Sequence, residues 1–228
     1  MAFQSQIAFT LDTVCPWTYL AKRRLEEALR QFYAAHPDAP VQYTIKYFPF
    51  QLNPQASQGG EPLDEYFRKK RPDMSPERMK MMRTIMTEYG RDCGINFKFE
   101  GQIAANTLNA HRLIQHYQKE KGPEIADKII LSLYTQYFEN AQHPSSPATL
   151  LKAATDAGIP ADEAEAFVAD ESIGQREVKL LIRQQAGAGI DGVPYIVIEG
   201  KKRDFATTGA REVGEYARIL EQVLREAE

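Results

Sequence analysis

The pattern of apolar and polar residues begins with a strand, a helix and a second strand. Residues 6–11 are a short apolar run that ends at Asp12, which is typical of a buried strand. In residues 25–32, apolar side chains recur at the spacing of a helix packed on a core. Residues 41–48 alternate apolar with polar side chains, which predicts another strand. This order favours a crossover unit with parallel strands.

The pattern then becomes helical for more than half of the chain. Prolines and glycines at 49–60 predict a loop, and nearly every periodic segment from about 61 to 185 is helical. Ser75-Pro76 and Ser146-Pro147 each have the form of an N-cap followed by a first-turn proline. A long run of helices inside an α/β pattern indicates an insertion.

Strand signals return only near the end. Residues 193–198 (VPYIVI) predict a strand, residues 202–206 predict a weaker one, and an amphipathic helix follows from Val213. Short strands at both ends of the chain must meet in one sheet. We therefore predict an α/β fold with a βαβ–ββα core at residues 1–54 and 189–228, and an all-helical insertion domain at 55–188.

Composition narrows the function classes. The chain has 228 residues, 43% hydrophobic and 26% charged, which is ordinary for a globular protein. A net charge of −3 gives no reason to expect a nucleic-acid partner, and no apolar run is long enough for a membrane span. The first ten residues lack the features of a secretory signal. Because only two cysteines are present and they are far apart, we expect a reducing, cytoplasmic location.

The candidate chemistry lies in residues 12–18 (DTVCPWT), between the first strand and the first helix. A cysteine at a helix start is a candidate thiolate, because free N–H groups and the helix dipole favour negative charge there. Pro16 suits the first helical position. Thr18 stands where a Cys-x-x-Cys motif has its second cysteine, and its hydroxyl either donates to the Cys15 thiolate or faces the helix interior. Cys15 itself is either this thiolate or a buried, inert cysteine.

A βαβ–ββα core with a cysteine at the first helix is the thioredoxin arrangement, in which a proline enters the third strand. Gly192-Val193-Pro194 stands at that place. In thioredoxin-like folds this X-Pro bond is cis, although cis bonds are a small minority elsewhere. Such a bond would turn the backbone of Val193 toward the thiol, where it can pair with a bound peptide or glutathione.

Together these motifs resemble the FrnE-like branch of the DsbA family. The resemblance covers nearly the whole chain. Its motifs are Cys15-Pro16-Trp17 before Lys22-Arg23-Arg24-Leu25-Glu26, Asn106-Thr107 before Ala110-His111-Arg112-Leu113, Gly192-Val193-Pro194, and Thr208-Gly209-Ala210. Relatives of that branch include kappa-class glutathione transferases and 2-hydroxychromene-2-carboxylate isomerases, which have serine in place of Cys15 and bind glutathione. The resemblance implies glutathione as a co-substrate.

Candidate binding residues follow from these motifs, each beside a structural alternative. Trp17 at an exposed turn suits contact with a substrate. Asn106 either positions a substrate backbone or caps a helix, and His111 either transfers a proton in the cleft or is a hydrogen-bonded scaffold residue. Thr208, Gly209 and Ala210 precede the last helix, where a γ-glutamyl carboxylate binds in glutathione-binding relatives; an ordinary cap is the alternative. The other histidines lack the spacing of metal ligands, so no metal is expected.

Three functions remain open at this point. The first is a thiol-disulfide oxidoreductase with Cys15 as nucleophile, shaped by Pro194 and resolved by glutathione or by Cys93. The second is a glutathione-dependent isomerase or transferase acting on a small aromatic or polyketide-like compound. The third is a binding protein without turnover. A small-molecule or thiol/disulfide substrate is expected as partner, and a homodimer stays open.

Overall fold

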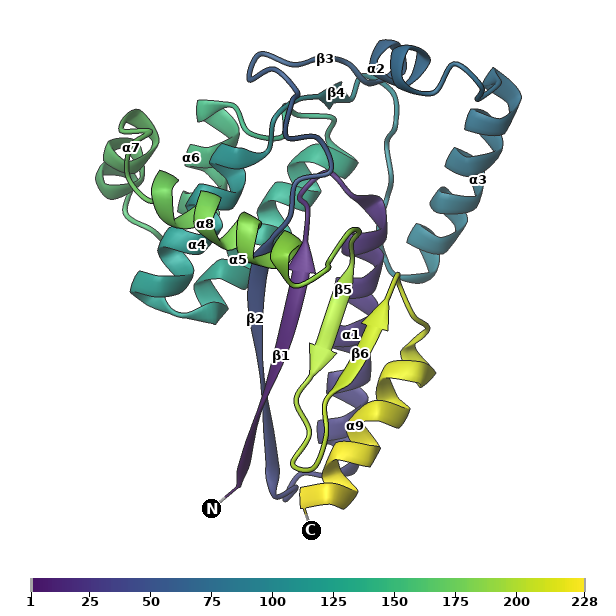
Figure 1. Ribbon diagram of the computed structural model, residues 1–228, viewed down its shortest axis with the longest axis vertical. Helices are drawn as coiled ribbons and strands as arrows, with labels where there is room; N and C mark the ends of the chain where they lie inside the picture. The colour runs from purple at the N-terminus through teal and green to yellow at the C-terminus, as the bar shows by residue number, and fades with distance from the viewer. Residues whose placement is uncertain (1, 228) are drawn as a thin grey trace.

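The computed structural model describes residues 2–227 and places a four-stranded sheet at the centre of the fold (Figure 1). The strand order is β2-β1-β5-β6. β1 and β2 are parallel, whereas β5 is antiparallel to β1 and β6 is antiparallel to β5. These strands are β1 (Phe3–Leu11), β2 (Val41–Pro49), β5 (Tyr195–Ile198) and β6 (Phe205–Thr208).

Two helices from opposite ends of the chain pack together behind the sheet (Figure 1). They are α1 (Pro16–Ala35) and α9 (Val213–Ala227). The apolar stripe of α1, including Leu25, Ala28 and Phe32, is buried as its periodicity predicts. The βαβ–ββα order expected from the sequence is therefore present, and the domain boundaries stay a prediction.

The intervening residues form two groups of elements. Five helices and a short π-helix gather over one end of β1 and β2, where α8 crosses in front of the strands (Figure 1). The smaller group flanks the other side, with α3 standing apart from the body. The first group contains α4 (Leu108–Lys121), α5 (Pro123–Tyr134), η1 (Thr135–Glu139), α6 (Pro147–Asp156), α7 (Ala161–Ala169) and α8 (Gln175–Gly187). The second contains β3 (Glu61–Pro62), α2 (Leu63–Lys70), α3 (Pro76–Asp92) and β4 (Ile103–Ala104).

The helical cover explains how burial changes along β1. At the open end of the strand Gln4 and Gln6 are exposed, whereas Phe9, Thr10 and Leu11 are all buried. Thr10 donates through Oγ1 to Oε1 of Gln185 in α8, at 3.0 Å. The residues that follow β1 are thus enclosed by the helices before the chain reaches Cys15.

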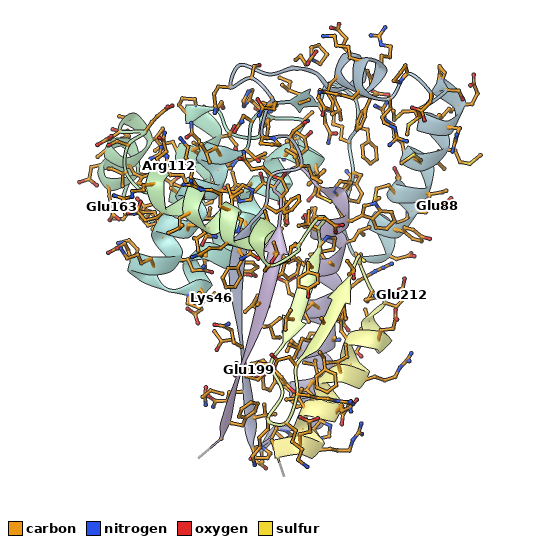
Figure 2. The ribbon with its side chains drawn as sticks, in the orientation of Figure 1. Lys46, Glu88, Arg112, Glu163, Glu199 and Glu212 are labelled. Atoms are coloured by element: carbon orange, nitrogen blue, oxygen red, sulfur yellow. The ribbon has the colours of Figure 1, made fainter. Side chains whose placement is uncertain are left out.

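A buried arginine holds the large helical group together. Arg112 of α4 lies inside this group, as Figure 2 shows, and its Nη1 lies 2.9–3.3 Å from the carbonyl oxygens of Phe167, Asp170 and Ile173. Its guanidinium also lies over the Phe167 ring, 4.3 Å from the centroid. A buried cation without a carboxylate partner is costly unless polar groups satisfy it. These carbonyls, at and just beyond the end of α7, satisfy Nη1, whereas Nε and Nη2 have no hydrogen-bond partner among the described residues.

Several sequence predictions can be compared directly with these elements. Ser75 and Ser146 both cap helices through their side chains, as predicted. The last strand begins at Phe205 rather than 202, because the turn after β5 extends to Asp204. The β3–β4 pair and the π-helix were not predicted, since segments of two to five residues leave no periodicity to detect. Within residues 2–227, no helix is both long and apolar enough to cross a membrane.

Close packing at Gly90 provides a test of how α3 is held. A Cβ added at Gly90 would overlap the Phe97 ring, which is itself buried and cannot move freely. We expect Gly90→Ala to lower the free energy of unfolding by about 1–3 kcal/mol, despite the helix propensity of alanine. Urea unfolding measures this change.

Gly214 in α9 is the matched control, because an added Cβ there meets nothing within 4 Å. Gly214→Ala should be neutral or stabilising by up to about 1 kcal/mol. A Gly90→Ala variant at least as stable as the original protein would contradict this account of the contact.

Candidate active site

Cys15 is the N-cap residue of α1, with Pro16 in the first turn of the helix. The turn before the helix is closed by a bond from the Cys15 N–H to the carbonyl of Asp12, at 3.1 Å. The Val193–Pro194 peptide bond is cis. The carbonyl oxygen of this bond, Val193 O, lies 3.7 Å from Cys15 Sγ and accepts the thiol hydrogen. The structure thus brings together the cysteine and the proline loop that the sequence placed in one site.

The thiol is not the accessible thiolate that the sequence led us to expect. Cys15 is only 4% exposed. Burial raises the pKa of the thiol to about 11, against the opposing effect of the Thr18 and Trp17 N–H groups, and the charge of Asp12 raises it further. The expectation of a lowered pKa is therefore wrong, because loss of solvation outweighs the helix N-terminus.

Thr18 is fully buried, and its hydroxyl stabilises the backbone of the turn more than it stabilises the Cys15 sulfur. Its hydroxyl lies 2.6 Å from the carbonyl oxygen of Cys15 and 2.9 Å from that of Asp12, and it accepts a bond from the Tyr134 hydroxyl at 2.9 Å. Since a hydroxyl has one proton, that proton goes to a carbonyl. The Thr18 hydroxyl has the smallest of the effects that lower the pKa of Cys15, whereas the Thr18 N–H has the largest. The side chain faces the interior between α1 and α5.

Asp12 is the site residue that sequence reasoning missed. Its side chain is completely buried beside Cys15. One carboxylate oxygen accepts the Leu52 N–H at 2.7 Å, and the other lies 3.2 Å from Nε2 of His111. The sequence shows Asp12 only as the residue after a buried strand, three positions before the motif cysteine, and its contact with His111 leaves no signal in that pattern.

His111 faces Asp12 rather than a cleft. It is 0% exposed, and its Nδ1 makes no hydrogen bond within the described part of the chain. Two neighbouring hydroxyls, of Thr13 and Thr107, are buried without partners as well. His111 is thus buried against Asp12 and does not reach the surface, which favours the hydrogen-bonded scaffold residue of the two alternatives.

Trp17 lies at the surface and links three elements. It is 39% exposed, and its ring contacts that of Tyr89 of α3 in a tilted arrangement, with 6.0 Å between the centroids. Arg24 lies over the Tyr89 ring and forms a 3.0 Å ion pair with Glu212, which Figure 2 shows at the start of α9 below α3. The tryptophan of the motif therefore borders an exposed face that continues along α3.

Asn106 holds a loop in place. Its Oδ1 accepts bonds from the Leu108 N–H and from the side chain of Gln51, each at 2.9 Å, and its amide donates to Pro54 O at 2.9 Å. The side chain caps the start of α4 and fixes the loop after β2. The structure supports the structural alternative for this residue.

Residues 208–210 lie against the proline loop. The Gly209 N–H donates to Pro194 O at 2.9 Å. α9 begins only at Val213, and the carboxylate of Glu215 already accepts the Glu212 N–H at 3.1 Å. Thr208, Gly209 and Ala210 are thus near the site, but the helix start that follows carries acidic groups of its own.

Cys93 does not reach Cys15. It ends α3 and lies against Arg23, Arg24 and Arg30 of α1. At 1.5 Å per residue, that part of α1 is about 12 Å or more from Cys15. Disulfide partners have Cα atoms within about 7 Å, so these two cysteines cannot pair in this conformation. Among residues 2–227, no group of three or more His, Cys, Asp or Glu side chains is arranged to hold a metal ion.

The sequence profile of the DsbA-like thioredoxin domain matches residues 6–221. The chain belongs to the DsbA-like thioredoxin family. Its fold is accordingly thioredoxin-like with a helical insertion, as the sequence predicted. No curated protein sequence is significantly similar to the chain.

Solved structures of this DsbA-like fold include both oxidoreductases and an isomerase. A probable DsbA oxidoreductase from Streptomyces coelicolor has a TM-score of 0.84 and 24% identity, over 98% of this chain and 92% of that one. The cytosolic disulfide reductase DsbM from Pseudomonas aeruginosa has a TM-score of 0.65 and 14% identity, over 96% of this chain and 98% of that one. A 2-hydroxychromene-2-carboxylate isomerase has a TM-score of 0.63 and 14% identity, over 96% of each chain. At these identities the likeness shows the shared fold.

The raised pKa makes a prediction about the reactivity of Cys15. In a Cys93→Ser background, we expect alkylation by iodoacetamide to be slow at pH 7 and to rise nearly tenfold per pH unit toward pH 11. A midpoint at or below the ordinary thiol value of about 8.5 would contradict the burial argument.

The same measurement tests the electrostatic effect of Asp12. Asp12→Asn removes a buried negative charge, keeps an oxygen for the Leu52 N–H, and should lower the pKa of Cys15. We expect alkylation at pH 8 to be about three to ten times faster. Asp38→Asn, in the exposed turn after α1, is the control and should leave the alkylation rate unchanged. An unchanged rate in Asp12→Asn would mean that this carboxylate does not act on the thiol.

Proposed function

We propose that the protein is a glutathione-linked enzyme in which Cys15 acts as a protonated hydrogen-bond donor. The observation that carries this proposal is the buried thiol itself. With a pKa of about 11, on the order of one Cys15 in ten thousand is ionised at pH 7. A thiol that keeps its proton is a poor nucleophile but retains a donor, directed in this structure at Val193 O.

In this role Cys15 does what serine does in the isomerases and transferases that the motifs resemble. The S–H would turn from Val193 O to the sulfur of bound glutathione and stabilise it as a thiolate. The Val193 N–H has no partner among the described residues, so it is free to pair with the glutathione backbone. The neighbour DsbM has also been solved with GSH, which supports glutathione as the co-substrate.

The surface beside the site suits a small apolar substrate. Met82, Ile85 and Tyr89 follow one another at helical spacing on α3, all are exposed, and Tyr89 touches Trp17. Exposed large apolar side chains in a continuous row are a sign of binding. This favours the glutathione-dependent isomerase or transferase on an aromatic or polyketide-like compound.

A second candidate is disulfide exchange through a single cysteine. The observation in its favour is that the N–H groups of Thr18 and Trp17 are directed at Sγ and lower its pKa, so the thiolate would be stabilised once water reached it. Cys15-SH and a substrate that carries glutathione in a mixed disulfide would give the Cys15–glutathione mixed disulfide and the free substrate thiol. Reduced glutathione would then regenerate Cys15-SH and release oxidised glutathione, so that the substrate disulfide is reduced at the expense of two glutathione thiols, one of them supplied by the substrate. Either chemistry requires a glutathione-rich compartment, and we propose the cytoplasm.

Serine and alanine at position 15 separate these candidates. Serine keeps a donor, so Cys15→Ser should retain at least about a third of glutathione-transferase activity on 1-chloro-2,4-dinitrobenzene. Cys15→Ala removes the donor and should lose about a hundredfold. Cys93→Ser is the control and should be fully active.

Equal and complete loss of enzyme activity in both Cys15 variants would identify Cys15 as a nucleophile and favour disulfide exchange. Absence of any activity in the original protein, with a melting temperature that rises on adding glutathione, would instead identify a binding protein.

Restoring the second motif cysteine tests whether only the resolving thiol is missing. In Thr18→Cys we expect oxidation to join Cys15 to residue 18, because the resolving thiol then lies at the usual spacing on the same helix. The variant should gain insulin-reducing activity in the presence of glutathione. Thr13→Cys, also buried nearby, should gain none. If mass spectrometry finds no disulfide in oxidised Thr18→Cys, the turn does not retain the redox geometry of the family.

A further inference from the structure

The largest of three described cavities lies outside the Cys15 site. It has a volume of about 1190 Å³ and is enclosed by α2, α3 and residues 96–100. In Figure 1, α3 runs beside the extended chain that leads back from its lower end, and α2 lies above both. Neither Cys15 nor Pro194 lines this cavity, which we call the α2–α3 groove.

The groove has an aromatic floor. The rings of Phe97 and Phe99 stack at 5.5 Å with an interplanar angle of 16°, and Phe67 lines the opposite wall. Phe97 is held from behind by Tyr19, 6.2 Å away edge-on, and from the side by Gly90. Because Phe97 is buried and is stacked on Phe99, the rings of Phe99 and Phe67 are the ones left to contact a ligand, and they favour one that is itself aromatic.

The charge of the groove differs from that of the whole chain. Six basic and four acidic side chains line it, although the chain carries a net charge of −3. Two of the four carboxylates are already engaged, since Asp64 pairs with Arg83 and Glu139 accepts bonds from Tyr19 and Asn96. The other two are Glu88 and Glu100. The excess of positive charge favours an anionic ligand.

Two cations stand where an anion could bind next to the floor. Arg83 lies over the Phe99 ring, 5.9 Å from its centroid, and is held there by Asp64 from α2. Only one of its terminal nitrogens is used by that pair, so further N–H groups stay free. Lys80, one turn earlier on α3, has no carboxylate within 4.0 Å among residues 2–227.

We propose that the α2–α3 groove binds a small planar aromatic carboxylate. The ring packs against Phe67 and the edge of Phe99, and the carboxylate is held by Arg83 and Lys80. This binding is separate from the glutathione-linked chemistry at Cys15, because no residue of the Cys15 site lines the groove. It is therefore expected whether or not the proposed function is correct.

Calorimetric titration of the full chain with 2-naphthoate tests the proposal. We expect saturable binding of one molecule, at least about ten times tighter than that of the uncharged 2-naphthalenemethanol, and weakened by salt. Lys80→Glu should weaken binding at least tenfold, and Phe99→Leu should weaken both probes. Lys179→Gln on the exposed face of α8 is the control and should bind like the original protein.

Several outcomes would overturn the proposal. These are no saturable binding up to millimolar 2-naphthoate, equal binding of the uncharged probe, or unchanged affinity in Lys80→Glu. Loss of binding in Cys15→Ser would place the probe at the thiol site instead. Because Lys80 is exposed, Lys80→Glu is expected to fold even if Phe99→Leu does not.

Discussion

The contact between Cys15 and the Val193 carbonyl is the constraint on which the site depends. The two residues are 178 positions apart in the chain and meet only because β1 and β5 are neighbours in the sheet. The contact gives the thiol hydrogen an internal acceptor in a place from which water is excluded. Chemistry at this sulfur therefore starts from S–H, and this distinguishes the site from one with an exposed thiolate at a helix start.

The helical insertion supplies much of that environment. His111 on α4 contacts Asp12, and Tyr134 on α5 donates to Thr18, so two helices far from the motif in sequence enclose it. A threonine at position 18 suits this enclosure, because its hydroxyl accepts a hydrogen bond from Tyr134 and donates one to a backbone carbonyl of the turn. A thiol there would form weaker hydrogen bonds. The residue that removes the resolving cysteine thus also strengthens the turn.

The sequence was a good guide wherever structure follows from local pattern. The order of strands and helices, the capping serines 75 and 146, and the meeting of Cys15 with residues 193 and 194 could all be predicted. The state of the thiol could not, because its burial depends on residues more than 90 positions away that leave no mark near the motif. Asp12 was seen only as the end of a strand, since its role appears only when His111 is placed beside it.

The buried thiol also bears on what ligand binding can change. Desolvation is the largest cause of its raised pKa, and a ligand that covers the site excludes water as well. Ionisation would then require a new cation near the sulfur. Arg24 of α1 does not supply it, because it lies about two turns along the helix from Cys15 and is already paired with Glu212 and packed on Tyr89. In the proposed function a bound substrate therefore leaves Cys15 protonated unless it brings its own positive charge, and a glutathione thiolate, which brings a negative charge, is an acceptor to which the protonated Cys15 can donate.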